Sequence, residues 1–399
     1  MFCCGVKVSD RVTAVSITPI PLEADSRTFR IACTLAEAGF RSVVVEGRSS
    51  VRRFWDDTIE VISLAGPQTG ASPGSALPEG RFRRLAAALR RGRGGTVGNA
   101  ILYAGFRTYD WRRHCRAPRS VLPAADLYYL HSFEMHRAIA PAARRNRARI
   151  VYDAHDFYRG VVPPEAQPSF DRQHLRPFYN GLEARLVTAA DAVVTVSNGV
   201  AEEMARVFGR RPEVIRNCHD GRRDRTGAPD LRTLIGLTAA DRLCVLVGNC
   251  KPGMAVDAAI EAISRLPGRY HLACVGRGYE EVQRRLPGGP LASRIHFGHV
   301  FDPDNLVPAI RSADVGLLLY RPYSTNYRHA LPNGFFQLIA AGLPLVRAPL
   351  AEVEAIIGSR QVGVCVQDLL PETLSAAIET CAAAAAPMRA ETAALAAGL

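Results

Sequence analysis

Apolar and polar residues follow two different periods along the first fifty positions. Residues 12–18 are a β-branched run typical of a strand, residues 26–38 place apolar side chains at helical spacing, and residues 42–46 are again strand-like. A strand, a helix and a strand in this order predict a parallel sheet. The pattern resumes after an irregular middle, and we expect strands at 126–130, 149–153, 192–196 and 213–216 and helices at 133–145, 171–189 and 199–208.

A second alternating series fills the rest of the chain. We expect its strands at 243–247, 271–275, 294–297, 315–319, 343–346 and 363–366, and an alanine-rich helix from residue 375. Residues 220–230 are charged and turn-rich and lack apolar periodicity, so they indicate a linker. The sequence therefore predicts an α/β protein with two Rossmann-like, doubly wound parallel-sheet domains, residues 1–221 and 222–399, facing each other across a cleft.

The composition is that of a folded globular protein. The 399 residues are 48% hydrophobic and 22% charged, and their number exceeds the size of a usual single core. Ten cysteines are scattered without a Cys-x-x-Cys pair, which favours reduced thiols. Because charged residues interrupt the apolar N-terminus and no apolar stretch is long enough to cross a bilayer, we expect a cytoplasmic protein.

The net charge of +12 indicates anionic partners: nucleotide phosphates, an acidic membrane surface or nucleic acid. Residues 81–119 carry most of the excess positive charge, because Asp110 is their only acid. Their arginines are interleaved with apolar and aromatic residues. This pattern favours peripheral contact with anionic lipid on the inner face of the cell membrane; a solvated face and a nucleic-acid patch are the alternatives. Without any recognised nucleic-acid-binding motif we expect no nucleic acid partner. The arginines are Arg81, Arg83, Arg84, Arg90, Arg91, Arg93, Arg107, Arg112, Arg113, Arg116 and Arg119.

Two glycine-containing turns follow expected strands of the second domain. The first, Gly248-Asn249-Cys250-Lys251-Pro252-Gly253, holds one of only two lysines in the chain, the other being Lys7. It allows close backbone approach before a helix and could bind a diphosphate, although it lacks P-loop spacing; the alternative is a glycine-rich turn with a solvated lysine. The second, Gly276-Arg277-Gly278, lacks the full dinucleotide fingerprint, which disfavours NAD binding.

Ionisable residues gather where the strand at 149–153 ends, in the segment Tyr152-Asp153-Ala154-His155-Asp156. Such groups are costly there unless they are paired or exposed at a cleft, so a structural His–Asp pair and a functional site are both open. His131 and His136 lack partners at zinc-ligand spacing and are expected to be structural or to line a cleft. Asp302-Pro303-Asp304 is similar to an Asp-x-Asp metal motif but precedes a helix-like run, so we interpret it as helix capping and expect no metal.

In this order the segments resemble family-four glycosyltransferases, retaining enzymes of the two-domain GT-B fold, over residues 17–378. The matching segments are 25–27 and 35–39 for the family's first helix, 152–156 for its active-site histidine, 215–220 for its interdomain element, 248–253 for its phosphate clamp, 276–278 for its Gly-x-Gly turn, and 331–337 with 341–344 for its nucleotide-sugar helix.

The resemblance implies transfer of a sugar from a nucleotide-sugar donor, UDP-linked by family habit, to a glycan, lipid-linked or small-molecule acceptor with retention of configuration, as in polysaccharide biosynthesis. It implies no metal and no other cofactor. His155 and Lys251 are the implied catalytic residues, one orienting or polarising a sugar hydroxyl and the other stabilising the leaving diphosphate. The implied donor-binding residues are Asn217, Gly248, Asn249, Gly276, Arg277, Gly278, Arg328, His329, Asn333, Gly334 and Gln337.

Three positions depart from the family pattern. Asn249 stands where the clamp arginine is usual, and His329 and Gln337 stand where the family has glutamates. Gln337 could still hydrogen-bond ribose hydroxyls, and Arg277 or Arg328 could supply the missing positive charge. The departures leave two alternatives open: a catalytically inactive GT-B nucleotide-sugar-binding partner protein, and a GT-B nucleotide-sugar epimerase.

Overall fold

The computed structural model describes residues 12–51, 57–65, 95–163 and 166–399. Two compact units divide the chain: the first holds residues up to 196 and 200–215, and the second holds 197–199 and 216–399. Each unit is built on one parallel sheet, which confirms the predicted α/β class with two Rossmann-like halves. The units divide after Ile215, just before the predicted linker; the assignment of acceptor and donor binding to separate domains stays a prediction.

The first unit contains a seven-stranded sheet of order β3-β2-β1-β4-β5-β6-β7. Its central strands are buried on both faces, which explains their continuous apolar runs. Neighbouring strands in it pair in parallel, so the carboxyl ends of β1, β4 and β5 lie at one edge. The strands are β1 Thr13–Thr18, β2 Arg41–Glu46, β3 Ile59–Ser63, β4 Leu127–Leu130, β5 Arg149–Ala154, β6 Ala192–Thr195 and β7 Glu213–Val214.

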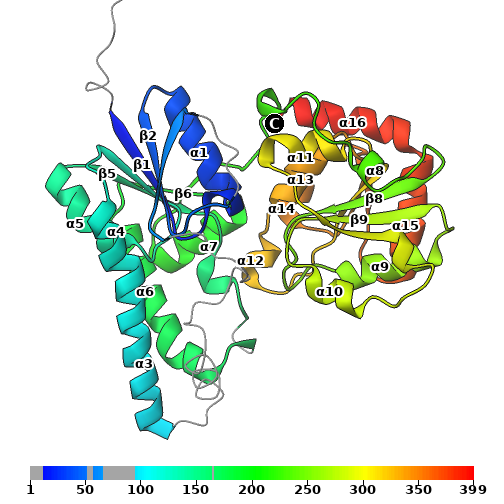
Figure 1. Cartoon of the computed structure of the whole chain (residues 1–399). Helices are drawn as coiled ribbons and strands as arrows, with labels where there is room; N and C mark the ends of the chain where they lie inside the picture. The colour runs from blue at the N-terminus through cyan, green and yellow to red at the C-terminus, as the bar shows by residue number, and fades with distance from the viewer. Residues whose placement is uncertain (1–11, 52–56, 66–94, 164–165) are drawn as a thin grey trace, which may run out of the picture. The chain divides into compact units, whose positions relative to one another are not determined.

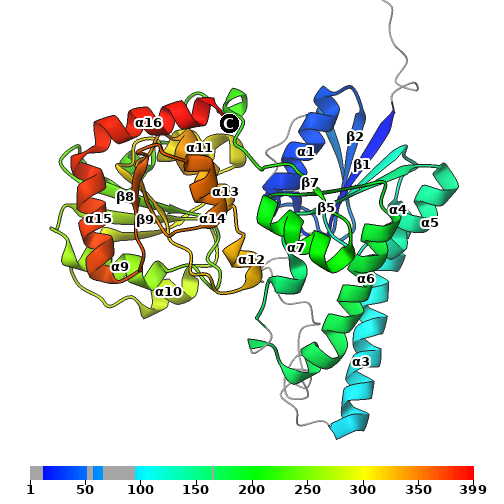
Figure 2. The same ribbon diagram turned by 180° about the vertical axis from the view of Figure 1, so that it is seen from behind.

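The region expected to be irregular contains strand β3 and a long helix, α3 Gly95–Trp111, so that expectation was wrong. β3 is a short edge strand, and Gly98 and Gly105 weaken the helical signal of α3. Figures 1 and 2 show α3 lying beside α6, where the ring of Phe106 meets those of Phe178 and Tyr179 edge-on. The other helices are α1 Ser26–Glu37, α4 Ala117–Val121, α5 His136–Asn146, α6 Arg176–Ala189 and α7 Asn198–Phe208, with π-helical turns at Arg112–Arg116 and Asp171–Leu175.

The second unit contains a six-stranded sheet of order β10-β9-β8-β11-β12-β13. Its strands are β8 Arg242–Val247, β9 Tyr270–Val275, β10 Ile295–His299, β11 Val315–Leu318, β12 Leu345–Arg347 and β13 Gly363–Cys365. Its helices are α8 Leu231–Leu234, α9 Val256–Arg265, α10 Glu280–Arg285, α11 Pro303–Ile310, α12 Thr325–Arg328, α13 Asn333–Ala340, α14 Ala351–Ile357, α15 Pro371–Ala383 and α16 Ala385–Ala397.

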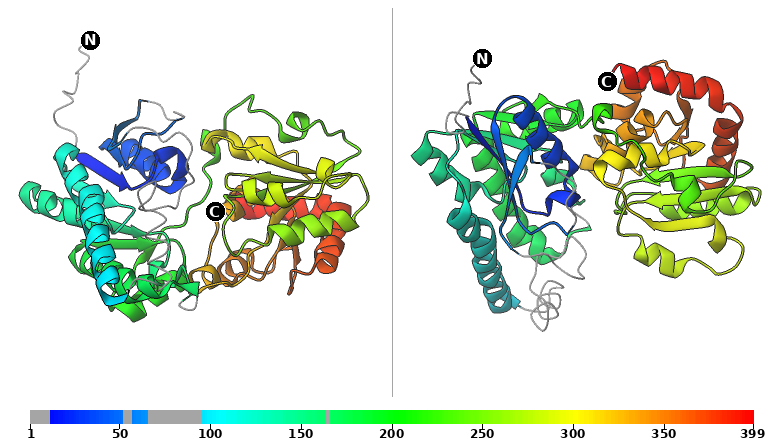
Figure 3. Two further views of the ribbon diagram at one scale, coloured as in Figure 1. Left: turned by 60° about the horizontal axis from the view of Figure 1, so that its bottom comes forward. Right: turned by 45° about the horizontal axis from the view of Figure 1, so that its top comes forward.

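The alanine-rich tail forms two helices, α15 and α16, that run along the second unit in both views of Figure 3. α16 packs against α13. The guanidinium of Arg389 donates to the carbonyls of Gly342, at 3.2 Å, and Ala313, and the Thr392 hydroxyl donates to the Leu343 carbonyl at 3.4 Å. The tail is therefore part of the second unit and supports α13.

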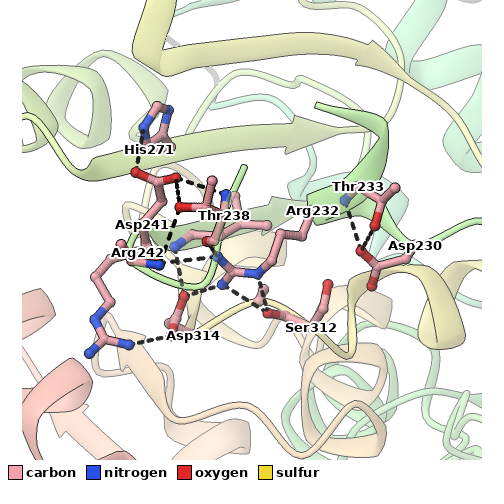
Figure 4. A network of polar contacts seen from close by, with 12 residues as sticks. Asp230, Arg232, Thr233, Thr238, Asp241, Arg242, His271, Ser312 and Asp314 are labelled. Atoms are coloured by element: carbon pink, nitrogen blue, oxygen red, sulfur yellow. Dashed lines mark hydrogen bonds and ion pairs between the residues drawn. The ribbon is translucent and has the colours of Figure 1, made fainter. Parts of the chain in front are cut away.

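A polar network fixes the chain where it enters the second unit (Figure 4). Asp230 caps α8 by accepting from the Thr233 N–H at 2.8 Å. Arg232 on α8 binds Asp314 at 2.5 Å, and Arg242 at the start of β8 binds the same carboxylate at 3.1 Å. One acid thus joins α8, β8 and the start of β11.

Asp302-Pro303-Asp304, which we interpreted as a helix cap, stands at the start of α11. Asp302 occupies the N-cap position as predicted, but its side chain makes no capping hydrogen bond. Asp304 instead lies 3.6 Å from the Arg223 guanidinium. Among the described residues, no cluster of three or more histidines, cysteines or acids has the arrangement to hold a metal ion.

Candidate functional site

Two turns meet at the carboxyl edge of the second sheet. The Gly248 N–H donates to the Val275 carbonyl at 2.9 Å, and the Cys250 N–H donates to the Arg277 carbonyl at 2.8 Å. Gly276 has φ +146°, and a Cβ there would lie 2.2 Å from the carbonyl oxygen of Gly248. Only glycine fits such a backbone-to-backbone contact, so these residues hold the ends of β8 and β9 together.

Asn249 braces the same pair of turns. Its Oδ1 accepts a hydrogen bond from the Arg277 N–H at 3.0 Å. The Tyr279 hydroxyl donates to the Gly248 carbonyl at 2.7 Å, which adds a second link. The structure thereby gives Asn249 a turn-stabilising role that the sequence did not indicate, while its contact with a donor stays a prediction.

Lys251 lies in the loop between these braced ends and α9. Its side chain is exposed, and its ammonium forms no hydrogen bond or ion pair with the described part of the chain. Gly253, with φ +93°, closes the loop against Tyr327 of α12, whose ring a Cβ would meet at 2.8 Å. A rigid turn therefore presents one free ammonium at the edge where parallel sheets bind ligands.

Helix α13 begins beside this edge. A Cβ on Gly334 would lie 2.8 Å from the Val247 carbonyl at the end of β8, so the first turn of the helix approaches the strand closely. The Asn217 amide donates to the Asn333 side chain at 2.7 Å. Gln337, one turn further, is 9% exposed, and its amide has no hydrogen-bond partner among the described residues.

Arg328 and His329 lie at the end of the short helix α12. The Arg328 guanidinium is exposed and donates to the Thr325 hydroxyl at 2.9 Å. The His329 carbonyl accepts from the hydroxyl of Ser197, which belongs to the second unit, at 2.9 Å. The second unit thus gathers the two glycine turns, Lys251 and the start of α13 around the end of β8, with α12 against Gly253.

The ionisable cluster of the first unit is centred on Asp153. This buried carboxylate forms two hydrogen bonds with Arg27 Nε, at 2.7 and 2.9 Å, and lies 3.5 Å from His131 Nδ1. Arg27 also donates to the Ile215 carbonyl at 2.9 Å. Asp153 is therefore a structural partner of Arg27 and His131, and sequence reasoning missed this pairing because the residues are far apart in the chain.

Burial and neighbouring charges set the pKa values of His131 and Asp25 in this cluster. Burial lowers the pKa of His131 to about 4 despite the nearby Asp153 carboxylate. Burial alone would raise the pKa of Asp25, but the charges of His131 and His155 and the hydrogen bonds from Thr28 leave that pKa below its ordinary value. At neutral pH the edge of the first sheet therefore holds a neutral His131 imidazole beside charged Asp25.

His155 follows β5 at this edge and is half-buried. Its Nε2 lies 3.4 Å from the Tyr158 hydroxyl, and its Nδ1 is buried without a hydrogen-bond partner. A buried, unsatisfied imidazole nitrogen is costly, and a ligand hydroxyl would remove that cost. His155 is therefore available to a ligand in a way that Asp153 is not.

The basic segment is described only in part. Arg81, Arg83, Arg84, Arg90, Arg91 and Arg93 lie outside the described residues, as does Lys7. Within α3, Arg107 stacks over Phe178, 4.3 Å from the ring centroid, and Trp111 is exposed. No helix in the described ranges is long and apolar enough to cross a membrane.

Comparison with known proteins gives matches over both units. The sequence pattern of Glycosyltransferase Family 4 matches residues 26–223, and that of Glycosyl transferases group 1 matches residues 241–384. No curated protein sequence matches the chain.

Several solved structures share the fold at low sequence identity. Sucrose-phosphate synthase from Thermosynechococcus elongatus superposes with a TM-score of 0.65 at 16% identity, covering 98% of this chain and 95% of that one. HepE from Anabaena, in complex with UDP and glucose, has a TM-score of 0.65 at 16% identity, with 97% and 94% coverage. WaaG, a glycosyltransferase involved in lipopolysaccharide biosynthesis, has a TM-score of 0.58 at 15% identity, with 96% and 94% coverage.

Proposed function

The chain belongs to the GT-B glycosyltransferases that resemble family 4, and from this premise we propose that it transfers a hexose from a nucleotide-sugar donor, a UDP-sugar, with retention of configuration. The acceptor we propose is a glycan, a lipid-linked molecule or a small molecule, as in polysaccharide biosynthesis. The observation that carries the proposal is the ammonium of Lys251, which has no partner among the described residues and stands on a loop held by two interlocked glycine turns. HepE, a protein of the same fold, binds UDP and glucose, which supports this donor class.

In the proposed reaction, negative charge develops on the leaving diphosphate. Lys251 would neutralise the diphosphate, and the N-terminal end of α13 would offer positive helix dipole to the donor. Preorganised charges of this kind lower a barrier without reorganisation during the reaction. Asn217 and Asn333 would fix the donor through the same helix end, with Gln337 binding the ribose hydroxyls.

His155 would bind a hydroxyl of the transferred sugar through its unpartnered Nδ1. His155 is a neighbour of Tyr158, which restricts the ring through the 3.4 Å contact at Nε2. This role requires the imidazole to position or polarise a hydroxyl, so His155→Ala should lower turnover more than donor affinity.

We further propose that the enzyme works without a metal or other cofactor in the cytoplasm, with peripheral contact to anionic membrane through residues 81–119. Unchanged turnover after treatment with a chelator would support metal independence. Loss of activity that added Mg²⁺ or Mn²⁺ restores would overturn it.

The test of the function is calorimetric titration with UDP, GDP, ADP and their sugar conjugates, followed by turnover assays with the donor that binds. Lys251→Ala should lower turnover by about 10²–10³-fold, because a charge aimed at the leaving group is lost. Arg360→Ala is the matched control: it removes one exposed positive charge just before β13, at the opposite edge of the same sheet.

The outcomes separate the alternatives. Donor binding and turnover that fall in Lys251→Ala and not in Arg360→Ala support the proposal. Donor binding without transfer or hydrolysis in the wild type would favour an inactive binding partner, and a changed sugar released without an acceptor would favour an epimerase. Equal loss in both variants would contradict the assigned role of Lys251.

A further inference from the structure

A pocket of about 360 Å³ lies in the first unit. Its walls come from the end of α3, the π-helical turn that follows, α4, α5 and α6. None of its lining residues belongs to the His155 cluster, so the proposed transfer reaction does not use it.

The lining is positively charged. It includes four arginines, Arg119, Arg137, Arg144 and Arg185, and no acid among the described residues that line it. Arg137 is bound to Asp110, and Arg119 donates to the Arg137 carbonyl at 2.7 Å. Arg144 and Arg185 remain: the first has no partner in the described chain, and the second donates only through Nε to the Gly181 carbonyl at 3.0 Å.

His136 supplies a second, independent sign of a ligand. It is 8% exposed and lines the pocket, yet its Nδ1 is buried without a hydrogen-bond partner. Burial, with the charges of Arg185 and Arg144, lowers its pKa to about 4, so the imidazole is neutral at pH 7. A neutral imidazole can donate to an anion, which would satisfy the nitrogen that the protein leaves unpaired.

The remaining walls are apolar. Trp111 is 43% exposed, and Ala140 and Pro141 form part of the surface beside it. A partly exposed indole in the same pocket as the Arg144 guanidinium and the terminal nitrogens of Arg185 suits a ligand with an apolar body and an anionic end. Inorganic phosphate alone would leave these apolar walls unused.

We propose that this pocket binds the phosphate group of an amphiphile, with the phosphate against Arg144 and Arg185 and the apolar body against Trp111 and Pro141. The proposal does not depend on the transfer reaction, because its residues differ from those assigned to the donor and to His155. It deepens the proposed contact with anionic membrane, because Trp111 and Arg119 lie within residues 81–119.

Trp111 provides the readout. The chain has two tryptophans, so Trp55→Phe leaves Trp111 as the sole indole. The intact protein in this background is titrated with monomeric dihexanoyl phosphatidic acid, with dihexanoyl phosphatidylcholine and with inorganic phosphate while Trp111 fluorescence is followed. The test variant adds Arg144→Ala and Arg185→Ala, and the matched control adds Arg145→Ala and Arg172→Ala, two exposed arginines outside the pocket.

We expect saturable binding of phosphatidic acid that the test variant weakens by at least about tenfold and the control leaves unchanged. Thermal melts of both variants confirm that they are folded. Equal binding of phosphatidylcholine would show apolar partition, and equal binding of inorganic phosphate would show a simple anion site. Either of these two results would overturn the proposal. The absence of saturable binding, or an equal loss of affinity in the control variant, would overturn it as well.

Discussion

Gly276→Ala tests whether the interlocked turns hold the proposed donor site. The new Cβ would lie 2.2 Å from the Gly248 oxygen and 2.6 Å from its carbonyl carbon, both backbone atoms that cannot rotate away. Relieving that overlap costs about 1–3 kcal/mol as an overpacked contact. Holding alanine at φ +146° adds about 1–3 kcal/mol.

We therefore expect Gly276→Ala to lower the free energy of unfolding by about 2–6 kcal/mol, measured by urea denaturation with circular dichroism. Donor affinity should fall as well, because the shifted turn would carry Gly248 and the Asn249 brace with it.

Gly268→Ala is the control at the other end of β9. Gly268 has no atom within 4 Å of the position a Cβ would take and no positive φ, so its replacement should change stability by less than about 0.5 kcal/mol. If the two variants were equally stable and bound donor equally well, the interlocking of the turns would not matter and the reasoning would fail.

Two further predictions concern the first unit. Arg27→Met should lower the free energy of unfolding, measured with urea, by about 3–5 kcal/mol because it leaves the buried Asp153 side chain without its guanidinium partner. Arg41→Met breaks the exposed pair with Glu60 and should lower it by at most about 1 kcal/mol; similar losses in both variants would refute the importance of the buried pair. Burial raises the pKa of Glu183 to about 7, although the Tyr152 hydroxyl and Arg159 oppose the rise. The folded state then binds more protons than the unfolded one between pH 4.5 and 7, so this group's stabilisation is lost as pH rises through that window. Glu183→Gln cannot show this fall, so the free energy of unfolding of the wild type should drop relative to that of the variant as pH rises; parallel curves would contradict the prediction.

The sheets could be predicted from the sequence because their central strands are buried on both faces and carry unbroken apolar runs. Edge strand β3 and the glycine-interrupted helix α3 lack that signal and were missed. Helix α16 was expected, but its contact with α13 depends on Arg389 and Thr392 reaching backbone carbonyls, which no local pattern encodes.

The candidate site, like the fold, could be predicted from the sequence only in part. Lys251 stood out because lysine is scarce in this chain, and its turn was identified from glycine spacing. The bond between Asn217 and Asn333, and the pairing of Arg27 with Asp153, join residues more than a hundred positions apart. Such contacts arise from topology, so a single sequence cannot reveal them.

The brace at Asn249 limits which side chains can occupy this position. Its Oδ1 holds the Arg277 N–H, and an arginine side chain, which has donors and no acceptor, could not replace that bond. Replacing Asn249 by the arginine that the family resemblance implies would thus supply a charge but loosen the turn. An arginine at this position would therefore need a second substitution near residue 277 that supplies a new acceptor for the Arg277 N–H.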